Sequence, residues 1–404
     1  MPDSPTASVP KPAWLPWWKP SAKERLARFL VFDLWSGLVR RFHRAPHVYR
    51  ARRIAAPLPG SRPPEAEGEL LDAFRFYNRH WEEVDLARDE YLYEVEGPCR
   101  IDPMGGWAIL PGFGVLEESA PHGYNMGLPG LRTHLRPPTL RLDSVVLLTD
   151  PFDTNHMHFL NEILGRLALF ERRGVSRSIP VLITKRLADY PLWKECLANG
   201  APELRDRNWI VQDGTVRIEA ARVIFGKPAI HDRETGEGVL RLIGCCPPPP
   251  PGPGRKIFLT RRGRRTFANL AEIEAVAARE GLEVVDPGTL PFAAQMALFA
   301  DASAIVGPHG SAFDNILFRQ GAPLRILEIF PPGFTPPFHC WQAAAFGYAY
   351  RGLRAPDAGG PLSSGPEAEL ANFHFDADAF AAALRRFLEE TETGAAAPSP
   401  LATP

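Results

Sequence analysis

A histidine between two glycines is the first feature of the chain that could support chemistry. Residues 303–306 are apolar, Gly307-Pro-His-Gly310 interrupts them, and the residues from Ser311 onward have the apolar spacing of a helix. A strand, a tight loop and a helix start leave backbone N–H groups unpaired at a sheet edge, where the helix dipole also favours an anion. His309 would add a switchable donor or acceptor there. The pattern predicts an anion site, for example for a diphosphate, although Gly-x-His-Gly also occurs in plain turns.

A cluster of arginines follows another predicted strand, at 256–260. Six basic residues and no acidic residue lie between Arg255 and Arg265. Guanidinium groups suit phosphate oxygens, and ligands of open α/β sheets bind at the carboxyl ends of the strands. The cluster therefore favours a phosphate site, with a solvated basic loop as the alternative.

Polar residues also gather at the start of a long helix predicted from about Thr154 to Arg173. His158 and Glu162 are four residues apart and share one helix face, so they could form a general base or a sugar-binding group. A core histidine with a satisfied hydrogen bond is the alternative. A metal site that includes His156 is disfavoured, because residues i and i+2 of a helix point to different faces.

The elements that must position these residues alternate between strand and helix. Short strands that are apolar throughout are typical of a parallel sheet with helices on both faces, so we predict an α/β fold in two halves. The first half has predicted strands at 144–149, 179–184, 208–213 and 217–225 and helices at 154–173 and 189–199. The second has predicted strands at 256–260, 282–286, 303–306 and 325–330 and helices at 269–281, 291–301 and 311–320.

Composition divides the chain further. Prolines fill residues 246–254, which cannot continue a helix or a central strand and are expected to form a stiff linker. Residues 91–118 are predicted to form a short β meander packed on the first half. The predicted divisions are a basic segment 1–56, a first domain 57–245, the linker 246–254, a second domain 255–350, a C-terminal segment 351–390 with a final helix at 376–388, and a disordered tail 391–404.

In order and spacing, the motifs resemble glycosyltransferase family 61, often labelled capsular polysaccharide biosynthesis proteins. The resemblance covers roughly residues 140–350 and rests on residues 155–166, Arg261, Arg265, Gln295, 307–315 and 327–329. It implies a GT-B architecture, with two Rossmann-like domains facing across a cleft. By analogy with such enzymes, the segment 338–388 is expected to cross back onto the first domain. It also implies inverting sugar transfer from a nucleotide-sugar, with no metal or other cofactor required. The chain departs from the family pattern at Gly165, Leu270, Ser311 and Asp314, which leaves the donor open.

Matched position by position, the resemblance also implies roles for single residues. Glu328 would lie near the donor and either hold the ribose or support the loop. Inverting transfer needs a base for the acceptor hydroxyl, expected to be His158 or Glu162, and histidine is preferred because it titrates closer to neutral pH. The implied donor-binding residues are Arg261, Arg265, His309, Gly310, Ser311, Asn315 and Glu328, and Asn155 and Arg166 would join His158 and Glu162 on the acceptor side.

The N-terminal region differs in charge from the rest of the chain. Residues 1–56 hold 11 Lys and Arg against 3 Asp and Glu, whereas the whole chain has a formal net charge of −1. A basic amphipathic helix is predicted at 21–44, and with the tryptophans before it residues 14–44 either contact a membrane surface or pack on the body. Because its apolar part is too short to span a bilayer and the five cysteines form no disulfide framework, we expect a cytoplasmic protein, which lies on the inner face of the membrane in the first of these two cases.

The sequence thus favours an inverting hexosyl- or pentosyltransferase that moves a sugar from a UDP-sugar to a glycan or glycolipid acceptor in cell-surface polysaccharide synthesis. The alternative is a catalytically silent nucleotide-sugar-binding or scaffold subunit. Nucleic-acid binding is disfavoured, because the basic regions do not interleave stacking aromatics with a nucleic-acid motif. The sugar, the acceptor, the linkage and the oligomeric state stay open.

Overall fold

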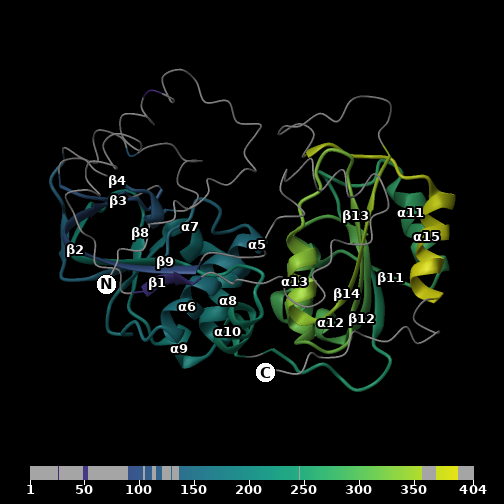
Figure 1. Cartoon of the computed structure of the whole chain (residues 1–404), viewed down its shortest axis with the longest axis horizontal. Coiled ribbons are helices and arrows are strands. Elements are labelled where there is room, and N and C mark those ends of the chain that lie inside the picture. Colours follow the sequence, from purple (N-terminus) through teal and green to yellow (C-terminus); the bar gives the residue numbers. More distant parts are fainter. Residues whose placement is uncertain are drawn as a thin grey trace, which may run out of the picture.

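The computed structural model describes residues 26, 49–52, 90–102, 105–111, 115–120, 129, 136–244, 246–356 and 370–389. Two β-sheets, each with its own helices, form two halves that lie side by side along the long axis of the molecule (Figure 1). Most of the predicted N-terminal helix and the whole of the predicted tail 391–404 lie outside the described residues. The α/β class predicted from the sequence is confirmed.

The first sheet has a parallel part and an antiparallel part. Its parallel strands run in the order β8-β7-β6-β9, which is the 3-2-1-4 order of a Rossmann half. Beyond β9 the antiparallel strands β2, β3 and β4 follow one another as a meander, as predicted for residues 91–118. The strands are β1 (Tyr49–Arg52), β2 (Glu90–Ile101), β3 (Ala108–Ile109), β4 (Val115–Leu116), β5 (Leu140–Leu142), β6 (Val145–Leu147), β7 (Val181–Thr184), β8 (Trp209–Gln212) and β9 (Ile218–Lys227).

The long helix predicted after β6 is present but has an irregular centre. It consists of α5 (His156–His158), a π-helical segment η4 (Phe159–Leu164) and α6 (Gly165–Arg172). π-helical turns inside helices are rare and are often found at functional sites. The other helices of this half are α7 (Lys185–Asp189), α8 (Pro191–Asn199), α9 (Pro202–Arg205) and α10 (Arg233–Ile243).

The second sheet is parallel, in the order β11-β10-β12-β13-β14. This is the 2-1-3-4-5 order of a doubly wound fold, in which the direction of winding changes between β10 and β12. Its strands are β10 (Arg255–Leu259), β11 (Glu283–Val285), β12 (Ala302–Pro308), β13 (Arg325–Phe330) and β14 (Ala349–Arg354). Its helices are α11 (Leu270–Arg279), α12 (Phe292–Asp301), α13 (Phe338–Phe346) and α15 (Ala377–Glu389), with 3₁₀ segments η5 (Pro287–Thr289) and η6 (Ser311–Arg319).

The helices of the second half divide between the two faces of its sheet. α12 and α13 lie on the side of the first half, and α11 and α15 on the far side (Figure 1). Phe380 and Leu384 of α15 pack in one core cluster with Ile273 of α11. Of the segment 338–388, α13 contacts the first half through α10, whereas the final helix α15 covers the second sheet and packs on α11. The domain boundary predicted at residue 350 falls inside β14.

Among the helices of the described ranges, none is long and apolar enough to cross a membrane.

Candidate functional site

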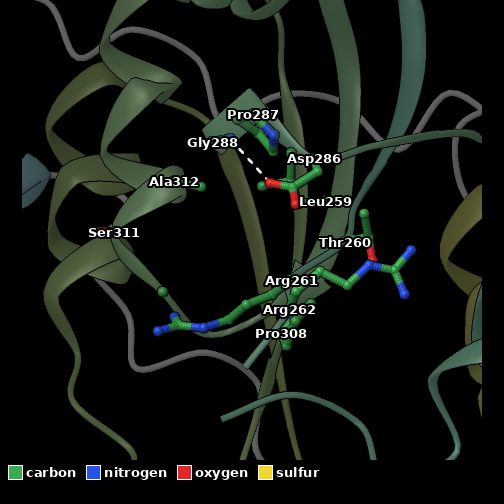
Figure 2. Close-up of a pocket in the computed structure, with 11 residues that line it drawn as sticks. Leu259, Thr260, Arg261, Arg262, Asp286, Pro287, Gly288, Pro308, Ser311 and Ala312 are labelled. Carbon is green, nitrogen blue, oxygen red and sulfur yellow. Dashed lines mark hydrogen bonds between the residues drawn. The ribbon is translucent and has the colours of Figure 1, made fainter. Parts of the chain in front are cut away.

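A pocket opens at the carboxyl ends of three neighbouring strands of the second sheet, where the winding changes direction. Open α/β sheets bind ligands at this point. Figure 2 shows how its lining residues are arranged. They are Leu259, Thr260, Arg261 and Arg262 after β10, Asp286, Pro287 and Gly288 after β11, and Pro308, Gly310, Ser311 and Ala312 after β12.

The two arginines that line this pocket point in different directions (Figure 2). Arg262 turns toward α11, where it pairs with Glu274 at 3.1 Å. Arg261 instead lies under the glycine loop, and its Nη1 donates to the backbone carbonyl of His309 at 3.3 Å. Burial and the nearby charge of Arg265 lower the pKa of Arg261 to about 10. Within the described residues Arg261 has no carboxylate partner, so an anion in the pocket would relieve this repulsion.

Arg265 lies near Arg261, whose pKa its charge lowers, and has an unusual backbone conformation. Its φ of 54° lies in the left-handed region, which non-glycine residues seldom adopt outside strained or functional positions. Its guanidinium lies 5.1 Å from the ring centroid of Phe334. Arg265 thus adds positive charge next to Arg261 without lining the pocket itself.

His309 belongs to a buried cluster of ionisable side chains behind the loop. Its Nδ1 lies 2.5 Å from Oε1 of Glu328, and Nδ1 of His339 lies 2.7 Å from the same oxygen. The hydroxyl of Tyr350 donates to Oε2 of Glu328 at 2.6 Å. Both carboxylate oxygens of Glu328 are therefore engaged inside the protein, where the residue has no exposed surface.

Burial and mutual attraction separate the pKa values in this cluster. Burial lowers the pKa of His309 to about 4 in spite of Glu328. Burial would also lower the pKa of His339, but the carboxylates of Glu328 and Asp314 raise it to about 10. Burial opposes ionisation of Glu328 as well, yet the two histidines lower its pKa to about 2. At neutral pH the cluster thus holds an ionised Glu328, a protonated His339 and a neutral His309.

Asp314 and Asn315 of η6 connect the two halves of the molecule. Oδ1 of Asn315 lies 2.6 Å from Nε2 of His156, and Oδ1 of Asp314 accepts from Nδ2 of Asn161 at 2.8 Å. On its other side, Asp314 lies 3.5 Å from Nε2 of His339. The helix that carries His158 and Glu162 is thereby docked on the segment that begins at the glycine loop.

His158 and Glu162 form a pair on that helix. Nδ1 of His158 lies 3.3 Å from Oε1 of Glu162, and the two side chains are 15% and 11% exposed. Arg166 is buried one turn further on, where it donates to the carbonyl of Thr149 at 3.0 Å and to Oδ2 of Asp150 at 3.3 Å. Asn155 is exposed and caps α5 by accepting from the backbone N–H of Met157 at 3.1 Å.

Two trios of side chains in the described residues hold potential metal-ligand atoms within 4.8 Å of one another. In His309, Glu328 and His339 these atoms are hydrogen-bonded to each other, whereas ligands around a zinc ion are held more than about 3 Å apart by bonds of 2.0–2.1 Å. In Asp150, His158 and Glu162, the aspartate already pairs with the cation of Arg166. In both trios, therefore, ligand atoms already have partners within the protein.

The structure separates the predicted site residues into groups. Arg261, Gly310 and Ser311 line the pocket, and Arg265 and His309 lie beside it. Asn315 and Glu328 are buried away from it. Sequence reasoning missed Asp286, although an acidic residue directly after a strand was a usable signal, and it missed His339, which no local motif marks.

Gly310 limits how the loop can change. A Cβ at this position would lie 2.3 Å from Nη1 of Arg261, while the backbone φ of 175° suits any residue. We therefore expect Gly310→Ala to displace the Arg261 side chain and weaken pyrophosphate binding by about tenfold, close to the loss of one charged hydrogen bond. Calorimetric titration measures this change. An unchanged affinity for pyrophosphate would show that the position of Arg261 does not determine this affinity. An unchanged melting temperature of the variant would show that its folding is intact.

Comparison with known proteins agrees with the motifs. Residues 156–325 match the family model described as Glycosyltransferase 61. The match runs from α5 to the start of β13 and includes His158, Glu162, the arginine cluster and the glycine loop. None of the curated proteins compared with the chain matched it. Residues 156–325 are thus similar to glycosyltransferase family 61, and this match supports glycosyltransferase activity for the chain.

Proposed function

We propose that this chain is an inverting glycosyltransferase that moves a sugar from a nucleoside-diphosphate sugar, with UDP-sugars favoured, to a hydroxyl of a glycan or glycolipid. One observation carries the proposal. The helix with His158 and Glu162 contacts η6, the segment that starts at the pocket of Arg261 and Gly310, through the His156–Asn315 pair. A base and a diphosphate site thus lie on elements in direct contact.

The pocket suits the leaving group. The diphosphate would accept hydrogen bonds from Arg261 and from the backbone N–H groups at the start of η6, with Arg265 adding long-range positive charge. These groups stabilise the negative charge that develops as the glycosidic bond to the diphosphate breaks. Glu328 supports the site indirectly, because it holds the ring of His309 and hence the loop whose carbonyl Arg261 contacts.

On the acceptor side we assign the base to His158. With Nδ1 turned to Glu162, its Nε2 takes the proton of the acceptor hydroxyl, whose oxygen attacks the anomeric carbon from the face opposite the leaving diphosphate. Glu162 then stabilises the imidazolium. The ring of Phe152, which is 37% exposed and lies 5.0 Å from that of His158, offers an apolar face to the acceptor sugar.

The family match and the basic N-terminal region support further parts of the proposal. We propose a GT-B arrangement of the two halves, a reaction without a metal ion, and a role in cell-surface polysaccharide assembly at the cytoplasmic face of the membrane. The basic segment 14–44 would hold the enzyme to anionic lipid. The competing function is a scaffold subunit that binds the nucleotide-sugar but performs no transfer.

Binding of nucleotides to Arg261→Ala tests the donor site. We expect UDP to raise the melting temperature of the native protein, and the variant to bind UDP and pyrophosphate about 10- to 100-fold more weakly, because one charged hydrogen bond is lost. Arg255→Ala is the matched control, since Arg255 lies at the opposite end of β10, where it pairs with Glu283, and its loss should leave affinity unchanged. Equal affinity of native and Arg261→Ala protein would contradict this location of the donor site.

A transfer assay separates the enzyme from the scaffold. Transfer of the sugar to an acceptor with inversion at the anomeric carbon, measured by NMR, would support the enzyme.

A further inference from the structure

Asp286 is the acidic residue among those that line the pocket, and its position is unexplained by diphosphate binding. It follows β11 directly, and the parallel register sets Val285 beside Leu259, so Asp286 stands next to Thr260 at the end of β10. The backbone N–H of Thr260 donates to the carbonyl of Val285 at 2.8 Å, which fixes this neighbourhood. Arg261 is the next residue along the chain.

Only part of the Asp286 carboxylate is used by the protein. Its Oδ1 accepts from the backbone N–H of Gly288 at 3.0 Å and so forms the turn into η5. In the described part of the chain, Oδ2 has no hydrogen-bond partner and Asp286 no ion pair. The second oxygen points away from Gly288, toward Leu259 and Thr260 (Figure 2).

A carboxylate in a diphosphate pocket restricts what part of the ligand can lie beside it. Phosphate oxygens would be repelled, so the neighbouring group must be neutral and must donate hydrogen bonds. In a nucleoside diphosphate, the ribose hydroxyls are the groups next to the phosphates with this property. Dinucleotide-binding sheets use an acidic residue at the end of the second strand in the same way, to accept from the ribose 2′-hydroxyl, and β11 is the second strand of this half.

We infer that Asp286 accepts a hydrogen bond from the ribose 2′-hydroxyl of the donor and thereby selects ribonucleotide sugars over 2′-deoxyribonucleotide sugars. The inference rests on the proposed function, since it places the diphosphate between Arg261 and Ser311. It moves the ribose contact from Glu328, whose oxygens are occupied inside the protein, to Asp286. Thymidine-diphosphate sugars would accordingly be poor donors.

The substitution Asp286→Asn separates this role from a purely structural one. Asparagine keeps an oxygen for the N–H of Gly288 but replaces the second oxygen with an NH₂ group, which cannot accept. We expect the native protein to bind UDP about 10- to 100-fold more tightly than 2′-deoxy-UDP, and the Asp286→Asn protein to bind the two alike, as follows from loss of a charged hydrogen bond. Calorimetric titration gives both ratios, and the melting temperature without ligand should stay unchanged.

Pyrophosphate distinguishes failure of this inference from failure of the proposed function. Pyrophosphate has no ribose, so its affinity should be the same in native and Asp286→Asn protein and should fall in Arg261→Ala. If pyrophosphate and UDP bind in an Arg261-dependent manner but native protein does not discriminate against 2′-deoxy-UDP, the role of Asp286 is wrong and the donor site stands. If Asp286→Asn keeps the native discrimination, the role is also wrong. If native protein binds neither pyrophosphate nor UDP, GDP or CDP, the donor site is wrong and the inference falls with it.

Discussion

Replacing His158 with alanine should lower the rate of sugar transfer by about 10²- to 10⁴-fold, the usual contribution of a positioned general base. The imidazole is the group that we place against the acceptor hydroxyl, with its Nδ1 3.3 Å from Glu162. Because the donor pocket lies on the second half, UDP should bind the variant as tightly as it binds the native protein. The measurement is single-turnover transfer, with UDP affinity determined on the same preparation.

Glu162→Gln is the companion variant that assigns the base. If His158 is the base and Glu162 orients it, the glutamine variant should keep part of the activity, because an amide oxygen beside Nδ1 still stabilises the protonated ring, although less than a carboxylate does. If Glu162 were the base, its replacement would cost as much as that of His158 or more. Full activity of the His158→Ala protein would exclude the histidine, and loss of UDP binding in it would show a structural effect instead.

The fold was largely predictable because the central strands of its second sheet are mostly buried. Continuous apolar runs marked β10, β12 and β13 to within two residues of their observed ends. α10 was missed, since Gly236 and Gly238 disfavour a helix by about 1 kcal/mol each. In the structure they allow close packing, because a Cβ at either position would lie 2.7 Å from a neighbouring side-chain atom. Packing between distant segments thus overrides local preference there.

The site was less predictable, because several of its contacts join residues far apart in the chain. The motif placed Asn315 with the donor, but four residues into η6 its side chain has turned away from the pocket to His156. Asp314 stands where the family pattern usually has threonine. Its carboxylate contacts Asn161 and His339, and His339 lies outside the residues that match the family model. Such pairings depend on how the two halves dock, and no spacing within one segment reports them.

Replacing Glu328 with glutamine should have the largest effect on stability, lowering the free energy of unfolding by about 3–5 kcal/mol, as when one partner of a buried ion pair is removed. The variant would leave the imidazolium of His339 buried with Asp314 alone, at 3.5 Å. Tyr350→Phe is the matched control, because it removes a hydrogen bond to the same carboxylate but keeps the charge, and should cost about 1 kcal/mol. Urea unfolding at neutral pH compares the three proteins. Equal losses in both variants would contradict the charge argument.

The pH dependence of this stability gives a second, independent test of the ion pair between Glu328 and His339. The pKa of His339 is raised from 6.5 to about 10, so its contribution is fully present below pH 6.5 and is lost as the pH rises toward 10. The pKa of His309 is lowered from 6.5 to about 4, so the native protein is favoured above pH 6.5 and loses stability as the pH falls toward 4. The pKa of Glu328 is lowered from 4.5 to about 2, so its contribution to stability is present above pH 4.5 and is lost as the pH falls toward 2. Native protein should therefore be most stable near pH 6.5, and the alkaline loss should be much smaller in Glu328→Gln, because His339 has then lost its closest carboxylate. If the native and variant curves run parallel between pH 6.5 and 10, His339 is not the proton-binding partner of Glu328.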